Sequence, residues 1–243
     1  MKNYPRIYSL STLGLIHHYE NDYLFHNMRT DFVGDSGSGK SIIADLLQLI
    51  FVGSEMFESA TRTMDEKREL DGLVLRTPHK GIDIGYAFLN IEIQSRHYIV
   101  IGCYLESNSK RTKPFIIQGS SDPKANLLPI GQPLQTKDFK REGNICPLDD
   151  LLSQMEEKGL FLSYWETVKP YHRILYIHDI LPLDLASNEK TLKDYASVIR
   201  SFSRGKTIDT SNSNNLKQFI FGTEKIKENR KKYEDALKDF TDT

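Results

Sequence analysis

One short glycine-rich stretch constrains the fold of this chain more than any other feature. Between Thr30 and Phe51 the sequence reads TDFVGDSGSGKSIIADLLQLIF. A short apolar pair, Phe32 and Val33, precedes the glycines, and a long apolar-periodic run comes after them. Glycine permits positive φ angles and lets bare backbone N–H groups approach an anion closely. The stretch therefore predicts the end of a buried strand, an anion-binding loop and a helix in succession.

The loop fits the phosphate-binding pattern G-x-x-x-x-G-K-[ST], with Lys40 and Ser41 directly after its second glycine. In such loops the next helix points its unpaired N–H groups and the positive end of its dipole at the bound anion. The lysine reaches the β- and γ-phosphates, and the serine hydroxyl ligates Mg²⁺. A flexible Gly/Ser loop without a ligand is the simpler alternative. The predicted nucleotide site consists of Gly34, Asp35, Ser36, Gly37, Ser38, Gly39, Lys40 and Ser41, with Ser41 as the ligand of Mg²⁺.

The run after the loop predicts a buried helix. Ile42, Leu46 and Leu49 fall on one stripe at helical spacing, and a second apolar stripe lies beside the first. Apolar residues therefore surround most of the helix, which is typical of a helix inside a core.

Strand-like segments lie on both sides of the loop and its helix. They are found at residues 6–15, 22–26, 82–93, 97–106 and 114–118. The polar residues 94–96 join two of them as a hairpin. An antiparallel meander after the helix does not suit a simple nucleoside kinase, whose strands alternate with helices. It suits an α/β fold, a P-loop NTPase of the ATP-binding-cassette class with an antiparallel β-layer, followed by helices.

Three further helices are predicted after these strands. Periodicity and end signals place them at residues 146–159, 166–181 and 187–206. Gly159 can end the first, Ser187 or Asn188 can cap the third, and Gly205 can end the third. The second contains Asp179, which comes after an apolar run as a Walker B carboxylate would. Because no second acidic residue stands next to it and the spacing is helical, we predict a helix there rather than a catalytic strand.

The glycine loop and its helix resemble the N-terminal ATPase half of SMC-like proteins. In that family G-x-N-G-S-G-K-S is followed by T-x-x-D-A-I, and this chain carries VGDSGSGKSIIADLLQLIF. Asp45 matches the helix aspartate, whereas Ser36 replaces the usual asparagine and Leu46 the usual alanine. Two later segments, at residues 173–186 and 195–222, resemble the condensin-like ATPases of bacterial Wadjet-type defence systems against plasmids and phages.

This resemblance implies a division of the chain and a set of partners. Residues 1–222 would form the N-terminal lobe of an SMC-like ATPase head that binds Mg-ATP, and residues 223–243 would begin a coiled-coil arm. A solvated terminal helix is the alternative for the last segment. The implied partners are a C-terminal lobe or second SMC-like head, double-stranded DNA and accessory subunits. Gln218 is the candidate for sensing the γ-phosphate and Mg²⁺, and Gln94 is its rival.

Two motifs that this class needs for hydrolysis are not found in the sequence. There is no LSGGQ-like signature and no apolar run that ends in Asp-Glu. The first would contact the γ-phosphate from a partner head, and the second would contact Mg²⁺ and orient water. In SMC-like proteins both lie in a C-terminal half, beyond the coiled coil. We therefore expect a fragment, or a chain that pairs with another, and poor ATP hydrolysis by this chain alone.

Two other function classes stay open at this point. A small self-contained P-loop kinase would need Asp179 as its Walker B carboxylate. A nucleotide-gated interaction module would bind nucleotide without turnover. The setting implied by the resemblance is bacterial chromosome maintenance or defence against plasmids and phages.

Composition limits the partners and the compartment. The formal net charge is −1 and the pI is near 6.7, so no global basic excess indicates a nucleic-acid binder. Cys103 and Cys146 lie outside any CxxC pattern and are expected to be buried thiols in a reducing cytosol. No apolar run approaches the ~20 residues of a membrane span, so we expect a cytoplasmic protein without a membrane partner. The local candidates for DNA contact are Arg62, Lys67, Arg68, Lys110, Arg111, Lys113, Lys137, Lys140 and Arg141.

Overall fold

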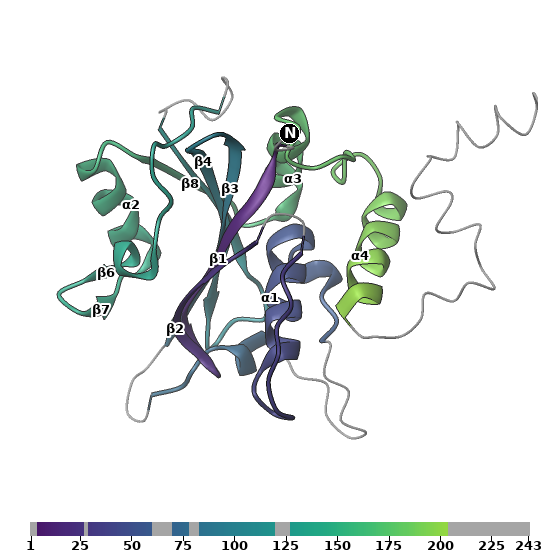
Figure 1. Ribbon diagram of the computed structural model, residues 1–243, viewed down its shortest axis with the longest axis horizontal. Helices are drawn as coiled ribbons and strands as arrows, with labels where there is room; N and C mark the ends of the chain where they lie inside the picture. The colour runs from purple at the N-terminus through teal and green to yellow at the C-terminus, as the bar shows by residue number, and fades with distance from the viewer. Residues whose placement is uncertain (1–3, 27–28, 60–69, 78–82, 120–126, 204–243) are drawn as a thin grey trace, which may run out of the picture.

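The computed structural model of this 243-residue chain describes residues 4–26, 29–59, 70–77, 83–119 and 127–203. Within these residues an antiparallel six-stranded sheet has the strand order β2-β1-β3-β4-β5-β8 (Figure 1). Its strands are β1 (Arg6–Leu15), β2 (His18–Leu24), β3 (Ile84–Gln94), β4 (His97–Glu106), β5 (Lys113–Gln118) and β8 (Phe161–Tyr164). The described helices are α1 (Lys40–Val52), α2 (Leu148–Glu157), α3 (Val168–Ile177) and α4 (Glu189–Ser203). The other described elements are a hairpin of β6 (Lys140–Arg141) and β7 (Asn144–Ile145), and 3-10 turns at Ser54–Met56, Leu70–Leu73 and Thr136–Phe139.

The strands largely occupy the predicted segments. β1 and β4 have the predicted bounds, and β3 and β4 form the predicted hairpin, in which Gln94 pairs with His97. Arg96 in the turn between them has a φ of 59°. β2 differs, because it begins at His18 rather than at residue 22. Most of its side chains are exposed or half-buried, so no apolar run marks its first half in the sequence.

Different elements cover the two faces of the sheet. Helices α1, α3 and α4 lie on one side, and α2 lies with the β6–β7 hairpin on the other (Figure 1). Leu46 of α1 packs into an aliphatic cluster with Leu89 of β3. The opposite cluster is rich in aromatic rings, and there Phe88 and Phe139 stack with their ring centroids 4.1 Å apart. Because β3 and β4 lie between two covering layers, their sequences are apolar along most of their length.

The described parts of the three later helices confirm their prediction. Gly159 comes after α2 with a φ of 68°, the conformation of a glycine that ends a helix. Asn188 caps α4, because its Oδ1 accepts a hydrogen bond from the backbone N–H of Lys190 at 2.8 Å. The segment before Asp179 forms α3 and no strand. Gly205, Gln218 and the predicted arm at residues 223–243 lie outside the described residues.

The two cysteines are buried free thiols, as predicted. Burial raises the pKa of Cys103 to about 12, so this thiol stays protonated at neutral pH. In the part of the chain that the structure describes, no helix combines the length and the apolar character needed to cross a membrane.

Candidate nucleotide-binding site

The predicted phosphate loop lies at the N-terminal end of α1. Gly37 and Gly39 have φ angles of 85° and 87°, in the left-handed region that glycine adopts without strain. Helix α1 begins at Lys40, so the loop leads directly into the helix. The first turn of α1 carries no acidic side chain, and the first N–H groups of a helix have no intrahelical partner. This end of α1 therefore offers backbone donors and the positive end of a dipole to an anion.

Lys40 folds back across the loop. Its Nζ donates to the carbonyl oxygens of Gly34 and Asp35, both at 2.6 Å, and to Ser38 Oγ at 3.2 Å. These acceptors hold the ammonium group over the residues to which the motif assigns phosphate binding. Because charge-assisted hydrogen bonds to phosphate are stronger than bonds to neutral acceptors, an anion that enters the loop can replace these carbonyl groups.

The segment before the loop does not form the strand that the sequence predicts. Residues 29–35 pair with no described strand, and the Val33 side chain is 94% exposed. Phe32 is half-buried and packs edge-on against Tyr23 and Phe25, with ring centroids 5.6 Å and 6.0 Å apart. A strand needs hydrogen-bonding neighbours, and the described sheet ends at β2. The prediction of a buried strand end at Phe32 and Val33 is therefore wrong for this structure.

Helix α1 itself is buried, as predicted. Its core-facing side chains belong to the larger apolar cluster of the molecule. Asp45, which matches the SMC-like motif, is 1% exposed, and its Oδ2 accepts a hydrogen bond from Ser59 Oγ at 3.0 Å. The segment after α1 is thus tied to the helix by a buried carboxyl group.

Side chains of α3 hold the C-terminal end of α1. Tyr171 Oη donates to the carbonyl oxygen of Ile50 at 3.0 Å, and His172 Nε2 donates to that of Phe51 at 3.0 Å. Both acceptors lie in the last turn, where helix carbonyl groups have no intrahelical donor. Burial lowers the pKa of His172 to about 4, so its ring is neutral at pH 7. Gly53 then ends the helix with a φ of 82°.

The structure adds a residue at the loop that sequence reasoning missed. His18, the first residue of β2, lies with Nε2 2.9 Å from the carbonyl oxygen of Gly39 and with Nδ1 2.7 Å from Tyr23 Oη. The phosphate-binding pattern contains no such histidine, and 21 positions separate His18 from Gly39. From the sequence, this contact could have been found only by recognising that β2 starts at His18.

Gln94, the rival candidate for sensing phosphate, lies far from the loop. Gln94 ends β3, and nearby Glu92 of that strand lies opposite Arg6 at the start of β1. The loop instead contacts His18, which lies beyond the other end of β1. The length of β1 separates the two places by roughly 30 Å. Gln94 is therefore not a residue of this site.

Asp179 does not occupy a Walker B position. It lies in the turn after α3, is exposed and has a φ of 56°. A catalytic carboxylate of this class stands at the end of a buried strand, whereas α3 is a helix whose residues Tyr171 and His172 contact the far end of α1. The kinase alternative therefore loses the residue on which it depended.

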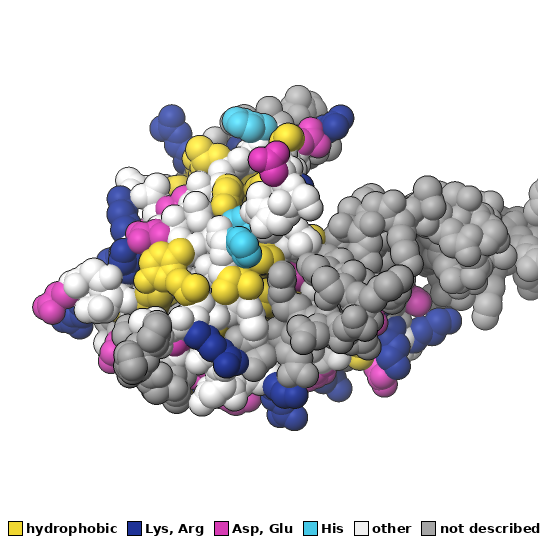
Figure 2. Space-filling model, turned by 90° about the horizontal axis from the view of Figure 1, so that it is seen from below, with side chains coloured by type: hydrophobic (Ala, Val, Ile, Leu, Met, Phe, Trp, Pro, Cys, Tyr) yellow, Lys and Arg dark blue, Asp and Glu magenta, His cyan; other side chains and the backbone are white. Residues whose placement is uncertain are grey.

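In the part of the chain that the structure describes, the basic residues considered for DNA contact do not form one patch. Lys113 at β5 pairs with Glu166 at 3.2 Å, whereas Lys140 pairs with Glu20 of β2 at 2.8 Å. β2 and β5 are four interstrand spacings apart in the sheet, about 19 Å. Seen from below, the described Lys and Arg side chains are dispersed around the outline of the molecule (Figure 2). Outside the described residues lie Arg62, Lys67 and Arg68.

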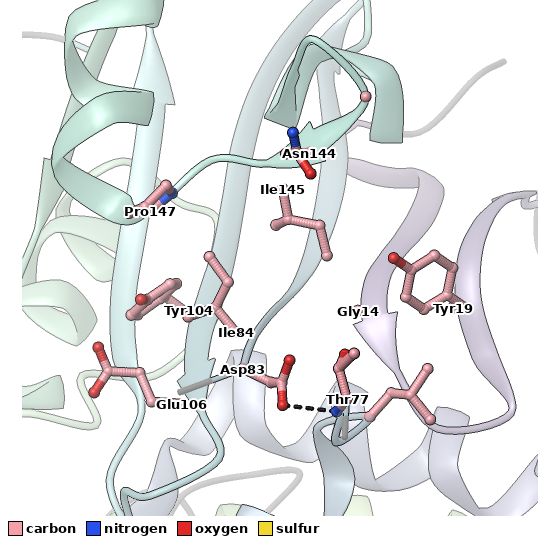
Figure 3. A pocket seen from close by; sticks show the side chains of 12 residues that line it. Gly14, Tyr19, Thr77, Asp83, Ile84, Tyr104, Glu106, Asn144, Ile145 and Pro147 are labelled. Atoms are coloured by element: carbon pink, nitrogen blue, oxygen red, sulfur yellow. Dashed lines mark hydrogen bonds between the residues drawn. The ribbon is translucent and has the colours of Figure 1, made fainter. Parts of the chain in front are cut away.

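A separate hollow of about 400 Å³ opens beside β1, β3, β4 and the β6–β7 hairpin (Figure 3). The rings of Tyr19 and Tyr104 and the carboxyl groups of Asp83 and Glu106 line it. Asp83 Oδ2 accepts a hydrogen bond from the backbone N–H of Thr77 at 2.8 Å. The described residues that line this hollow include no Lys or Arg and no residue of the phosphate loop. The charged groups among these described residues are carboxylates, which do not attract a phosphate group.

A comparison with protein families finds a likeness that covers most of the chain. The profile of the MukB N-terminal family matches residues 6–225. Among curated proteins, none matches the chain at a significant level. The matched residues include the sheet, the phosphate loop and the described helices. The match gives no support to the predicted resemblance to Wadjet-type defence systems. The chain therefore belongs to the MukB N-terminal family, which is the head region of a condensin-like SMC protein acting in chromosome organisation.

Proposed function

We propose that this chain binds Mg-ATP as the N-terminal half of an SMC-like ATPase head, which a C-terminal half completes. The observation that carries the proposal is the open N-terminal end of α1. There two left-handed glycines shape the loop, and Lys40 Nζ lies over it. In the proposal the loop N–H groups and Lys40 bind the phosphates, and the hydroxyl of Ser41 ligates Mg²⁺.

The segment before the loop supports the second part of the proposal. Residues 29–35 pair with no described strand, and they leave Val33 almost fully exposed beside the loop. A strand contributed by another lobe would cover Val33 and pair with this backbone, as in recognition by strand addition. The sequence also carries neither of the motifs that hydrolysis needs in this class. A completing half would supply both.

Family membership supports the biological setting of the proposal. The MukB N-terminal family belongs to a condensin-like SMC protein that acts in chromosome organisation. We infer that ATP-dependent engagement of two heads drives work on double-stranded DNA, together with accessory subunits. Chromosome maintenance is thus favoured over defence against plasmids and phages.

A nucleotide-gated interaction module without turnover is the second candidate. One specific observation favours it, namely that the whole G-x-x-x-x-G-K-[ST] loop lies within this chain whereas no apolar run ends in Asp-Glu. The two candidates share the binding step and differ in whether hydrolysis comes after it. A completing half should produce turnover in the first case and none in the second.

Calorimetric titration of Mg-ATP into the purified chain tests the proposal. Lys40→Ala should weaken binding at least about thirtyfold, because it removes a charge-assisted contact to phosphate. The matched control is Lys137→Ala, since Lys137 is exposed in the 3-10 turn on the other side of the sheet, and it should bind as the unaltered chain does. Turnover by the chain alone should be negligible. Equal binding by Lys40→Ala, or robust turnover without a partner, would contradict the proposal.

A further inference from the structure

His18 forms a buried link between the β1–β2 hairpin and the phosphate loop. It is 7% exposed, and its Nε2 lies 2.9 Å from the carbonyl oxygen of Gly39. A carbonyl oxygen only accepts hydrogen bonds, so Nε2 carries the proton. When the ring carries only this one proton, Nδ1 accepts a hydrogen bond from Tyr23 Oη, which lies 2.7 Å away. Burial raises the pKa of Tyr23, so this hydroxyl keeps its proton and can donate it.

This link fixes the orientation of one peptide group in the loop. The carbonyl oxygen of Gly39 also accepts a hydrogen bond from the N–H of Ile42 at 2.8 Å, so two donors hold it. The peptide group between Gly39 and Lys40 is planar, and in a trans peptide the N–H points opposite to the C=O. His18 therefore directs the N–H of Lys40 away from the hairpin. That N–H belongs to the first residue of α1, where helix donors have no intrahelical partner.

Gly39 allows the hairpin to come this close. A Cβ at Gly39 would lie 2.7 Å from His18 Nε2 and 2.8 Å from His17 Cβ. The second glycine of the motif is therefore required by the hairpin as well as by its own φ of 87°. Before the loop in the chain, Phe32 packs against the ring of Tyr23, with the two ring centroids 5.6 Å apart. Strand β2 thus contacts the loop at its entry and at its exit.

From this geometry we infer that His18, supported by Tyr23, is a positioning residue for the phosphates of the bound nucleotide. His18 does not touch the nucleotide, and it acts by orienting the Lys40 N–H through the carbonyl group of Gly39. The inference rests on the proposed nucleotide binding and adds a residue that the G-x-x-x-x-G-K-[ST] pattern does not contain. If His18 served only to fill the core, nucleotide affinity would change in step with folding stability in every variant.

Two amide substitutions separate the two hydrogen bonds of His18. In His18→Gln the amide Nε2 is the same number of bonds from the backbone as the histidine Nε2, so the bond to Gly39 is kept. In His18→Asn the amide lies at the level of Nδ1, so the contact with Tyr23 is kept and the bond to Gly39 is lost. We expect His18→Asn to weaken Mg-ATP binding about tenfold, which is the effect of losing one such hydrogen bond on an equilibrium constant. His18→Gln should retain most of the affinity of the unaltered chain. Tyr23→Phe should weaken binding about threefold, because it removes only the support of the ring.

The measurement combines calorimetric Mg-ATP binding, denaturant unfolding and ¹⁵N NMR of the histidine ring on the full chain. Without nucleotide, the neutral His18 ring should show a protonated Nε2 and an unprotonated Nδ1. The opposite tautomer would overturn the inference. Equal affinity of His18→Asn and the unaltered chain would also overturn it, and so would losses of affinity in both amide variants that parallel their losses of stability.

Failure of the proposed function is distinguishable from failure of this inference. If the unaltered chain binds no Mg-ATP, or binds it regardless of Lys40→Ala, the proposed function fails and the inference fails with it. If binding depends on Lys40 but not on the Gly39 contact of His18, the inference alone is wrong.

Discussion

The two ends of helix α1 are built in opposite ways. At the C-terminal end, Tyr171 and His172 donate hydrogen bonds to carbonyl groups of the last turn inside the core. At the N-terminal end, residues 34–38 are exposed and Lys40 bonds to carbonyl groups of its own loop. Groups that are satisfied by buried side chains are fixed when the chain folds, whereas exposed donors can be satisfied by a ligand. We infer that one end of α1 contributes stability and the other contributes binding.

The largest expected effect lies at the C-terminal end. Gly53→Ala would place a Cβ 2.0 Å from Val168 Cγ1, at a residue with φ 82° and ψ 177°. That backbone region is nearly restricted to glycine, and overpacking adds to the strain. We expect a loss of about 4 kcal/mol in the free energy of unfolding, measured by denaturant titration. Mg-ATP affinity of the folded fraction should stay unchanged.

Val168→Ala provides the matched control for that substitution. It removes the methyl groups that the new Cβ would meet, so Gly53→Ala combined with Val168→Ala should regain about 1–2 kcal/mol relative to the sum of the single losses. A loss below about 0.5 kcal/mol for Gly53→Ala would show that this end of α1 is not packed as described.

Acid should weaken the same end through His172. Its pKa is about 4 in the folded chain, below its ordinary value of 6.5, so the unfolded state binds more protons between these values. The stability that neutral His172 provides is therefore complete above pH 6.5 and is lost as the pH falls to about 4. The expected loss is roughly 3 kcal/mol. His172→Gln keeps an Nε2 donor for Phe51 but does not titrate, so its unfolding free energy should depend less on pH in this window. Parallel pH profiles for both proteins would refute this assignment.

Tyr171→Phe should have a smaller effect. It removes the hydroxyl group that donates to the buried carbonyl oxygen of Ile50 at 3.0 Å and leaves the ring in place. A buried carbonyl group without a donor costs about 1–2 kcal/mol of stability. Thermal unfolding would measure this loss, and an unchanged midpoint would show that the bond contributes nothing.

The smallest effect on stability is expected in the loop. Gly37 has a φ of 85°, but a Cβ there would meet nothing within 4 Å. Gly37→Ala should therefore cost only about 1 kcal/mol, the strain of a left-handed alanine. The substitution should change the free energy of Mg-ATP binding by more than it changes the free energy of unfolding. The reverse order would break the contrast between the two ends of α1.

Local signals explain which parts of the structure could be predicted. Helix α1 and the β3–β4 hairpin were predictable because apolar periodicity and turn residues lie within each segment. The phosphate loop was predictable because its motif is contiguous. The prediction that Val33 lies in a buried strand was wrong, because an apolar residue before such a loop is buried only if a neighbouring strand covers it. Nothing in the local sequence says whether this chain contains that strand.

Long-range contacts explain what was missed at the candidate site. His18 reaches Gly39 because the β1–β2 hairpin folds beside the loop, and the polar start of β2 hides this strand in the sequence. Gln94 was considered as a phosphate sensor from its residue type, but the register of β1 and β3 places it at the opposite end of the sheet. Residue type suggests a role, and strand register decides whether the residue can perform it.

Amide hydrogen exchange with and without Mg-ATP tests the central claim most directly. The claim is that the N-terminal end of α1 binds the nucleotide and that its C-terminal end is already satisfied by the fold. We predict slower exchange on nucleotide addition at residues 34–41, little change at residues 50–53, and loss of the effect in Lys40→Ala. No protection of the loop, or equal protection at both ends of the helix, would contradict the account.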